Sequence, residues 1–312
     1  MELSPQLLES LKVYKDKIKK DVSFLINDQD HPKKESFLTF LNGIASIFDK
    51  LDVRIEKTRY NQYSPLTFEI ASDDQPTGIL FSGIPGGHEF NSLILGTLQA
   101  GGSKINLDES LIDQIKQIDR NINFETLVSL SCENCPDVVQ NLNQFALISN
   151  NITNHTIDGN LYPKLVKERD VQSVPSVFVE GEMVASGRIS TANIIKKLVE
   201  KGLIRTKPKK SKLPIQDVVV IGGGPAGVSS AIYAARKGLN VSIVSEKFGG
   251  QLTETVGIEN FISNPYTTGK ELTSNLFNHA KEYDIILKEH VQVEKIGGED
   301  IKSITLSSGE KM

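Results

Sequence analysis

Apolar residues follow helical and strand spacings in alternation along the first 200 residues. Three- and four-residue spacing predicts helices over 7–18, 37–48, 88–98, 110–118, 161–167 and 191–199, with another from about Asp137. Short apolar or alternating runs predict strands at 22–26, 53–57, 66–71, 78–82, 124–130, 152–157, 177–179 and 182–185. Mixed helices and strands of these lengths indicate an α/β fold.

The order of predicted elements repeats after Leu107. Both halves also place a proline just before a strand, Pro65 in the first half and Pro175 in the second. We therefore interpret residues 1–104 and 105–202 as two copies of one α/β unit. This interpretation rests on the order of the elements rather than on matching residues.

A basic, polar segment separates this pair from a third part of the chain. Lys207–Lys212 contains no apolar residue. A nucleic-acid patch and a solvated linker both fit this composition, and the linker is favoured because the whole chain is acidic. We assign residues 203–213 to the linker and 214–312 to a new domain, where an apolar strand, a glycine cluster and an alanine-rich helix follow one another.

Composition and charge exclude several classes of protein. The net charge of −4 gives no electrostatic reason to expect a nucleic-acid or membrane surface. No apolar run approaches the roughly 20 residues that span a bilayer, and the charged N-terminus does not resemble a secretory signal. The chain has only two cysteines, three residues apart, too few for a disulfide scaffold. Together these features predict a cytoplasmic protein whose thiols serve chemistry.

The two cysteines lie in Ser131-Cys132-Glu133-Asn134-Cys135-Pro136, between a predicted strand and a predicted helix. At a helix N-terminus the dipole favours the thiolate, so Cys132 is predicted to be the nucleophile and Cys135 the resolving thiol. Structural zinc would need four ligands, and the chain offers no second cysteine pair and no histidines at ligand spacing, so no metal site is expected. A c-type haem site would need histidine in place of Pro136. A pair of buried, inert cysteines remains an alternative.

The third part opens with a dinucleotide-binding pattern. The strand Val218–Ile221 leads into Gly222-Gly223-Gly224-Pro225-Ala226-Gly227, which fits G-x-G-x-x-G, and a helix follows. These glycines allow a tight turn, a close approach of pyrophosphate and close packing of helix on strand. The phosphates are expected at the helix N-terminus. Glu246, after the next strand, is placed to accept hydrogen bonds from ribose hydroxyls. The glycines alone do not distinguish flavin from nicotinamide.

Several segments resemble known proteins. Phe248–Leu252 and Ile258–Phe261 are similar to flavin-contacting segments of the thioredoxin reductase class. Over nearly its whole length, the chain resembles the large flavoprotein subunit of bacterial alkyl hydroperoxide reductase. That likeness is carried by Gly87–Leu93, Ser131–Gln140 and Gly222–Leu252. The resemblance implies tandem thioredoxin-like units followed by an incomplete Rossmann-type FAD-binding domain.

The resemblance also implies roles for particular residues. Gly250, Gln251 and Asn260 are expected to approach the flavin. A cis-proline loop at Pro175 is expected beside the dithiol. Glu89 matches a glutamate that the family places next to the dithiol, although an exposed acid favoured by the helix dipole is an equal alternative.

In that family NADH reduces FAD, FAD reduces a second Cys-x-x-Cys, and the N-terminal dithiol then reduces a peroxiredoxin. The 312 residues contain neither a second cysteine pair nor a nicotinamide domain, so weak binding of FAD and no NADH oxidation are expected of this chain alone. A homodimer is expected if the FAD domain is complete. Two alternatives stay open: a dithiol carrier without flavin, and a thioredoxin reductase-like enzyme with another disulfide partner.

Overall fold

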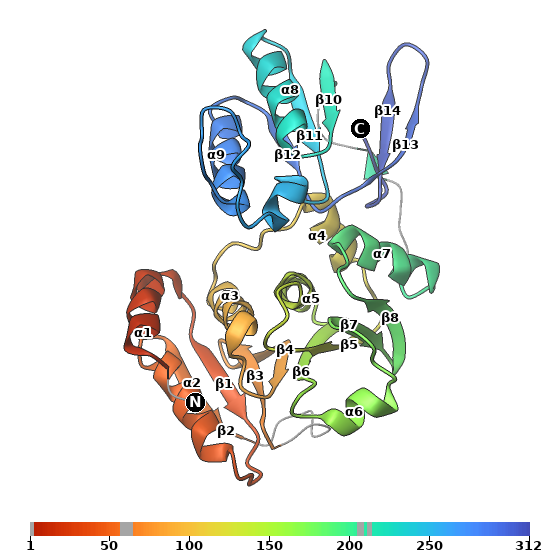
Figure 1. The fold of residues 1–312 in the computed structure, drawn as a ribbon. Coiled ribbons are helices and arrows are strands. Elements are labelled where there is room, and N and C mark those ends of the chain that lie inside the picture. The colour runs from red at the N-terminus through yellow and green to blue at the C-terminus, as the bar shows by residue number, and fades with distance from the viewer. Residues whose placement is uncertain (1–2, 57–64, 205–208, 211–213) are drawn as a thin grey trace. The chain divides into compact units, whose positions relative to one another are not determined.

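The computed structural model describes residues 3–56, 65–204, 209–210 and 214–312 (Figure 1). The chain divides into two compact units. The first comprises Met1–Asn106 and Ile115–Ile189, and the second comprises Leu107–Gln114 and Ser190–Met312. The predicted linker at 203–213 lies mostly outside the described residues.

The two halves predicted from the sequence contain the same order of strands. The elements of the first are α1 (Pro5–Leu11), η1 (Lys12–Lys17), β1 (Val22–Ile26), α2 (Lys34–Ala45), β2 (Leu51–Ile55), β3 (Thr67–Ser72), β4 (Gln75–Ser82), η2 (Gly87–Glu89) and α3 (Phe90–Ala100). Those of the second are α4 (Glu109–Lys116), β5 (Ile122–Val128), α5 (Cys135–Ile148), β6 (Ile152–Asp158), α6 (Pro163–Glu168), β7 (Ser176–Val179), β8 (Glu182–Ser186) and α7 (Thr191–Glu200).

One eight-stranded sheet runs through the first unit in the order β2-β1-β3-β4-β6-β5-β7-β8. β1 is parallel to β2 and antiparallel to β3, and β5 has the same relation to β6 and β7. Each half thus repeats the other strand for strand, which confirms the predicted tandem α/β units. The halves join where β4 pairs in parallel with β6.

Helices cover both faces of this sheet. Helices α3 and α5 pack together on one face, where Asn143 of α5 bonds to Asn154 of β6 at 2.8 Å. On the opposite face, Leu165 and Val166 of α6 pack against a buried cluster that includes Ile157. Alternate residues of β6 therefore face different helices, as the two-residue period of a strand requires.

Several element boundaries differ from the sequence prediction, and two of them lie near the dithiol. The helix after the cysteines begins at Cys135 rather than about Asp137, because Pro136 needs no N–H partner in the first helical turn. The helix predicted over 88–98 consists of the short 3₁₀ turn η2 followed by α3. Cys132 consequently lies before the helix and not inside its first turn.

The second unit is built on a parallel sheet with crossover helices. Besides α7 and most of α4, its elements are β9 (Lys209–Lys210), β10 (Val218–Ile221), α8 (Pro225–Arg236), β11 (Val241–Val244), η3 (Gly250–Glu254), α9 (Gly269–Lys281), β12 (Ile286–Lys288), β13 (Val293–Gly297), β14 (Ser303–Leu306) and β15 (Glu310–Lys311). The strands order as β10-β11-β12, all parallel. Val241 and Ile243 of β11 form a core with Val228 and Ala231 of α8. Ligands bind such sheets at the carboxyl ends of the strands.

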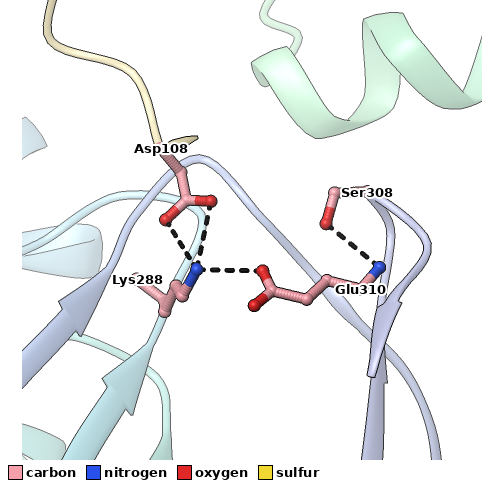
Figure 2. Close-up of polar contacts among 4 residues, drawn as sticks. All are labelled: Asp108, Lys288, Ser308 and Glu310. Carbon is pink, nitrogen blue, oxygen red and sulfur yellow. Dashed lines mark hydrogen bonds and ion pairs between the residues drawn. The ribbon is translucent and has the colours of Figure 1, made fainter. Parts of the chain in front are cut away.

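A second sheet, in the order β13-β14-β15-β9, belongs to the same unit. Figure 2 shows a charged cluster that joins it to β12. The Lys288 ammonium lies 2.9 Å from Glu310 Oε2 and 3.3 Å from Asp108 Oδ2. Burial alone would lower the pKa of Lys288, but the two carboxylates outweigh it and raise that pKa. The Glu310 N–H in turn donates to Ser308 Oγ at 3.5 Å.

Candidate functional site

The dithiol lies between the end of β5 and the start of α5. Cys132 and Cys135 form a disulfide, with their Cα atoms 5.5 Å apart. Cys135 is fully buried, whereas Cys132 is partly exposed. The backbone N–H of Cys135, which has no partner within the helix, donates to Cys132 Sγ at 3.1 Å. Such a donor stabilises negative charge, so the accessible sulfur is also the one that the helix favours as a thiolate.

The loop at Pro175 closes over one side of the dithiol. The Val174–Pro175 peptide bond is cis, and the carbonyl oxygen of Val174 lies 3.7 Å from Cys132 Sγ. The Pro175 carbonyl accepts a hydrogen bond from the Gly187 N–H at 2.8 Å, which fixes the loop to the end of β8. A disulfide partner that reaches Cys132 would therefore meet this loop.

At the equivalent position of the first half, between β1 and α2, an ammonium group takes the place of the sulfur. Helix α2 begins at Lys34 after β1, as α5 begins at Cys135 after β5. The Lys34 Nζ donates to the carbonyl oxygens of Pro65, at 3.1 Å, and Asn27. An amine held by backbone carbonyls has no redox chemistry, and both cysteines of the chain lie in the second half.

The first half still contributes to the dithiol through the turn η2. The His88 N–H donates to the Leu130 carbonyl at 3.0 Å, two residues before Cys132. Gly87 has φ +54°, and a Cβ there would come within 2.3 Å of the same oxygen. Helix α5 also contacts η2. Glu89 is thereby held in a turn that packs directly on the chain leading to the cysteines.

Glu89 is fully buried, contrary to the exposed acid that was its alternative interpretation. Burial raises the pKa of Glu89 to about 7, and the nearby Ser92 hydroxyl opposes this rise. Neither carboxylate oxygen reaches a donor among the described residues with full hydrogen-bond geometry. The carboxyl group can therefore take up and release a proton near neutral pH.

A small pocket opens beside Glu89, at the carboxyl ends of β4, β5 and β6. It is lined by Phe81, Ser82, Gly83, Ile84, Pro85, Glu89, Val128, Leu130, Thr156 and Asp158. Burial raises the pKa of Asp158 as well, opposed by the Asn160 N–H and by Lys33. The sequence prediction did not include Thr156 or Asp158. Asp158 could have been found, because it directly follows the apolar strand predicted at 152–157.

A buried polar chain crosses the centre of the sheet, and sequence reasoning missed it too. Thr67 Oγ1 and Ser82 Oγ are 2.6 Å apart, and Ser82 Oγ is 2.6 Å from His155 Nε2. Burial lowers the pKa of His155 to about 3. The imidazole is therefore neutral near pH 7 and serves as a structural hydrogen-bonding group.

The glycine loop of the second unit leaves space where a pyrophosphate would lie. Gly222 has φ +112°, and a Cβ on Gly227 would come 2.0 Å from the Gly222 carbonyl oxygen. A Cβ on Gly224 would meet open space. Helix α8 begins at Pro225, and its N-cap residue Gly224 makes no side-chain cap. The N–H groups of the first turn, including those of Ala226 and Gly227, have no partner inside the helix, which is the feature that lets helix N-termini bind phosphate. This cradle fits a dinucleotide.

Of the other predicted cofactor residues, only some lie close to this loop. Gly250 faces it, since a Cβ there would lie 3.5 Å from Gly224 Cα. Glu246 follows β11 at the carboxyl edge of the sheet and is exposed. Gln251, in η3, and Asn260, beyond it, are also exposed. The residues present therefore fit FAD. The glycine loop suits its phosphates, Glu246 lies at the same edge of the sheet, and the amides of Gln251 and Asn260 lie on the segments that follow.

No helix among the described residues is long and apolar enough to cross a membrane. Within the same ranges, no three His, Cys, Asp or Glu side chains gather in a way that could hold a metal ion.

Two known protein families match the parts of the chain that contain these sites. Residues 122–200 match a thioredoxin domain, and residues 217–284 match an FAD dependent oxidoreductase. The first match contains the dithiol and Pro175. The second contains the glycine loop and Glu246.

Relatives match nearly the whole chain. A protein named NADH dehydrogenase from Ferdinandcohnia aciditolerans is 39% identical over 312 residues, which are 99% of this chain and 58% of that protein. The AhpF subunit of alkyl hydroperoxide reductase from Pseudomonas aeruginosa is 38% identical over 283 residues, 91% of this chain and 54% of the relative. The chain therefore spans little more than half the length of these relatives.

Solved structures match the thioredoxin-like region. The NTD_N/C domain of alkylhydroperoxide reductase AhpF from Enterococcus faecalis has a TM-score of 0.58 and 29% identity, over 63% of this chain and 99% of that one. A protein disulfide oxidoreductase from Aeropyrum pernix has a TM-score of 0.56 over 66% of this chain and 97% of that one. At 17% identity, this second likeness concerns the fold alone.

Proposed function

We propose that this chain, a relative of the AhpF subunit of alkyl hydroperoxide reductase over nearly its whole length, relays electrons through Cys132 and Cys135 to a peroxiredoxin. The observation that carries the proposal is the asymmetry of the two sulfurs. Cys132 is partly exposed, and its Sγ accepts the N–H of Cys135 at the start of α5, whereas the Cys135 side chain is fully buried. A nucleophile and a resolving thiol need this arrangement.

Disulfide exchange proceeds in two steps. The reduced Cys132 thiolate attacks one sulfur of the partner disulfide, and a mixed disulfide forms as the partner's other sulfur leaves as a thiolate. The Cys135 thiolate then attacks Cys132 Sγ and releases the partner's second sulfur. The partner gains two electrons and two protons, and the Cys132–Cys135 disulfide is restored.

Other residues of the first unit support these steps. We propose that the loop at Pro175 lies against the partner segment that carries the attacked disulfide. Glu89 is proposed to take up the proton released when the resolving thiol ionises, since its carboxyl titrates near neutral pH in a pocket beside Leu130.

The second unit is proposed to hold FAD. The loop Gly222–Gly227 with Gly250 would hold the pyrophosphate, Glu246 the ribose hydroxyls, and Gln251 and Asn260 the flavin end. Bound FAD supplies two-electron transfer between a nicotinamide and a disulfide. NADH is the proposed donor of the whole protein, which we place in the cytoplasm as a homodimer.

The test uses the 312-residue chain reduced with dithiothreitol and freed of reductant. Mixed with an oxidised two-cysteine peroxiredoxin, it should convert one partner disulfide to two thiols per chain, measured by mass spectrometry after alkylation. Thioredoxin, as a competing partner, should react more slowly. A faster reaction with thioredoxin would favour a thioredoxin reductase-like enzyme, and absence of FAD binding in a titration would favour a carrier without flavin. No reduction of any disulfide partner would contradict the proposal.

A further inference from the structure

Ser245 lies at the end of β11, directly before Glu246, and its hydroxyl group is buried without a partner. The residue is 7% exposed, and Ser245 Oγ makes no hydrogen bond among the described residues. Its backbone is satisfied, because its N–H donates to the Lys288 carbonyl at 2.8 Å. A buried hydroxyl that lacks a partner costs free energy, so such groups are normally hydrogen-bonded.

The Ser245 hydroxyl points to the glycine loop. A Cβ atom on Gly223 would lie 2.8 Å from Ser245 Oγ and 3.1 Å from Phe248 Cα. The missing side chain at Gly223 therefore leaves the space in which this hydroxyl lies. The loop is fixed there from both sides, since Gly222 donates to the Val244 carbonyl and Gly223 accepts from the Gly249 N–H, each at 2.8 Å.

We infer that Ser245 is a further dinucleotide-binding residue, whose hydroxyl hydrogen-bonds to the adenosine diphosphate part of the ligand. The inference rests on the proposed binding of FAD by this unit. Three features meet at Ser245: an unpartnered polar atom, the phosphate-binding glycine loop above it, and the exposed Glu246 carboxylate next to it in sequence. The ligand would supply the partner that the protein lacks.

Ser242 provides a matched control on the same strand. Its side chain is fully buried and its Oγ also lacks a hydrogen-bond partner among the described residues. It pairs with Val219, whereas Val241 and Ile243 face the core with α8. Ser242 thus lies on the opposite face of β11, three residues from Ser245.

The experiment titrates FAD and, separately, ADP into the 312-residue chain and its variants by calorimetry. Ser245→Ala should weaken both ligands by about three- to tenfold, the effect of one hydrogen bond. Ser242→Ala should leave both affinities unchanged. The melting temperature without ligand should not fall in Ser245→Ala, because its hydroxyl has no partner to lose.

Two outcomes would overturn the inference, and they differ. Equal affinities of the wild type and Ser245→Ala for FAD and ADP would overturn the role of Ser245 and leave flavin binding intact. Failure of the wild type to bind either ligand would overturn the flavin part of the proposed function together with the inference.

Discussion

Gly87 lies so close to the carbonyl oxygen of Leu130 that a Cβ atom on it would come within 2.3 Å. Gly87 belongs to the half without cysteines, and Leu130 comes two residues before Cys132. The contact therefore ties the first half of the sheet to the dithiol of the second. It also explains why glycine occupies this position, where φ is +54°.

Gly87→Ala should destabilise the first unit by roughly 1–3 kcal/mol beyond the cost of a left-handed alanine, because the turn must move away from Leu130. Gly102→Ala is the control, since Gly102 also has a positive φ (+98°) but only lysine side chains near it. Urea unfolding measures both variants. Equal losses of stability would show that the contact with Leu130 is not tight.

Glu89→Gln should change stability in a pH-dependent way. The pKa of Glu89 is raised from 4.5 to about 7, so the native state binds its proton more tightly than the unfolded state. Stability then falls as pH rises from 4.5 to about 7, by up to about 3 kcal/mol. The Gln variant should match the wild type at pH 5 and exceed it at pH 8 in urea unfolding. The exposed Glu133→Gln serves as control, and equal behaviour of the two variants at pH 8 would contradict the buried carboxylate.

His155 should make the first unit sensitive to acid. Burial lowers its pKa from 6.5 to about 3, so the unfolded state binds the proton more readily and stability is lost as pH falls below about 6.5. His155→Gln keeps a group able to bond to Ser82 but does not titrate. Followed by circular dichroism, this variant should lose less stability than the wild type between pH 6.5 and pH 4. A parallel loss in both proteins would assign the acid sensitivity to other groups.

Gly224→Ala should separate ligand binding from folding. Its Cβ meets no protein atom within 4 Å, so the melting temperature should stay within about 1–2 °C of the wild type. The methyl group would enter the space that the pyrophosphate needs, and FAD affinity should fall at least about tenfold. Gly227→Ala, with a Cβ 2.0 Å from the Gly222 oxygen, should instead melt lower even without ligand. Unchanged FAD affinity in Gly224→Ala would contradict the cradle.

Much of the fold follows from local patterns. The alternating spacings predicted the order of strands and helices in both halves, and the relatives and the fold confirm the resemblance stated from the motifs. The pairing of β4 with β6 could not be predicted, because it joins strands about 75 residues apart in sequence and no local spacing encodes it. The start of α5 at Cys135 depends on cap geometry around Pro136, which spacing does not resolve.

Fewer features of the candidate site than of the fold could be predicted from the sequence. The spacing of Cys132 and Cys135 at a helix start indicated their chemistry directly, with Cys132 as the accessible sulfur and Cys135 as the deeper one. Glu89 was ambiguous until its burial was known. Thr156, Asp158 and Ser245 drew no notice because a single polar residue at the end of a strand is common, and only packing shows that its atoms are buried.

The central claim is that Cys132 attacks the partner disulfide and Cys135 resolves the intermediate. The most direct measurement incubates reduced Cys135→Ser with an oxidised two-cysteine peroxiredoxin and maps the covalent adduct by peptide mass spectrometry, with Cys132→Ser as the reciprocal variant. The account predicts a stable mixed disulfide through Cys132 in the first variant and little or none in the second, because Cys135 is buried. An adduct that forms faster through Cys135 in the Cys132→Ser chain would contradict it.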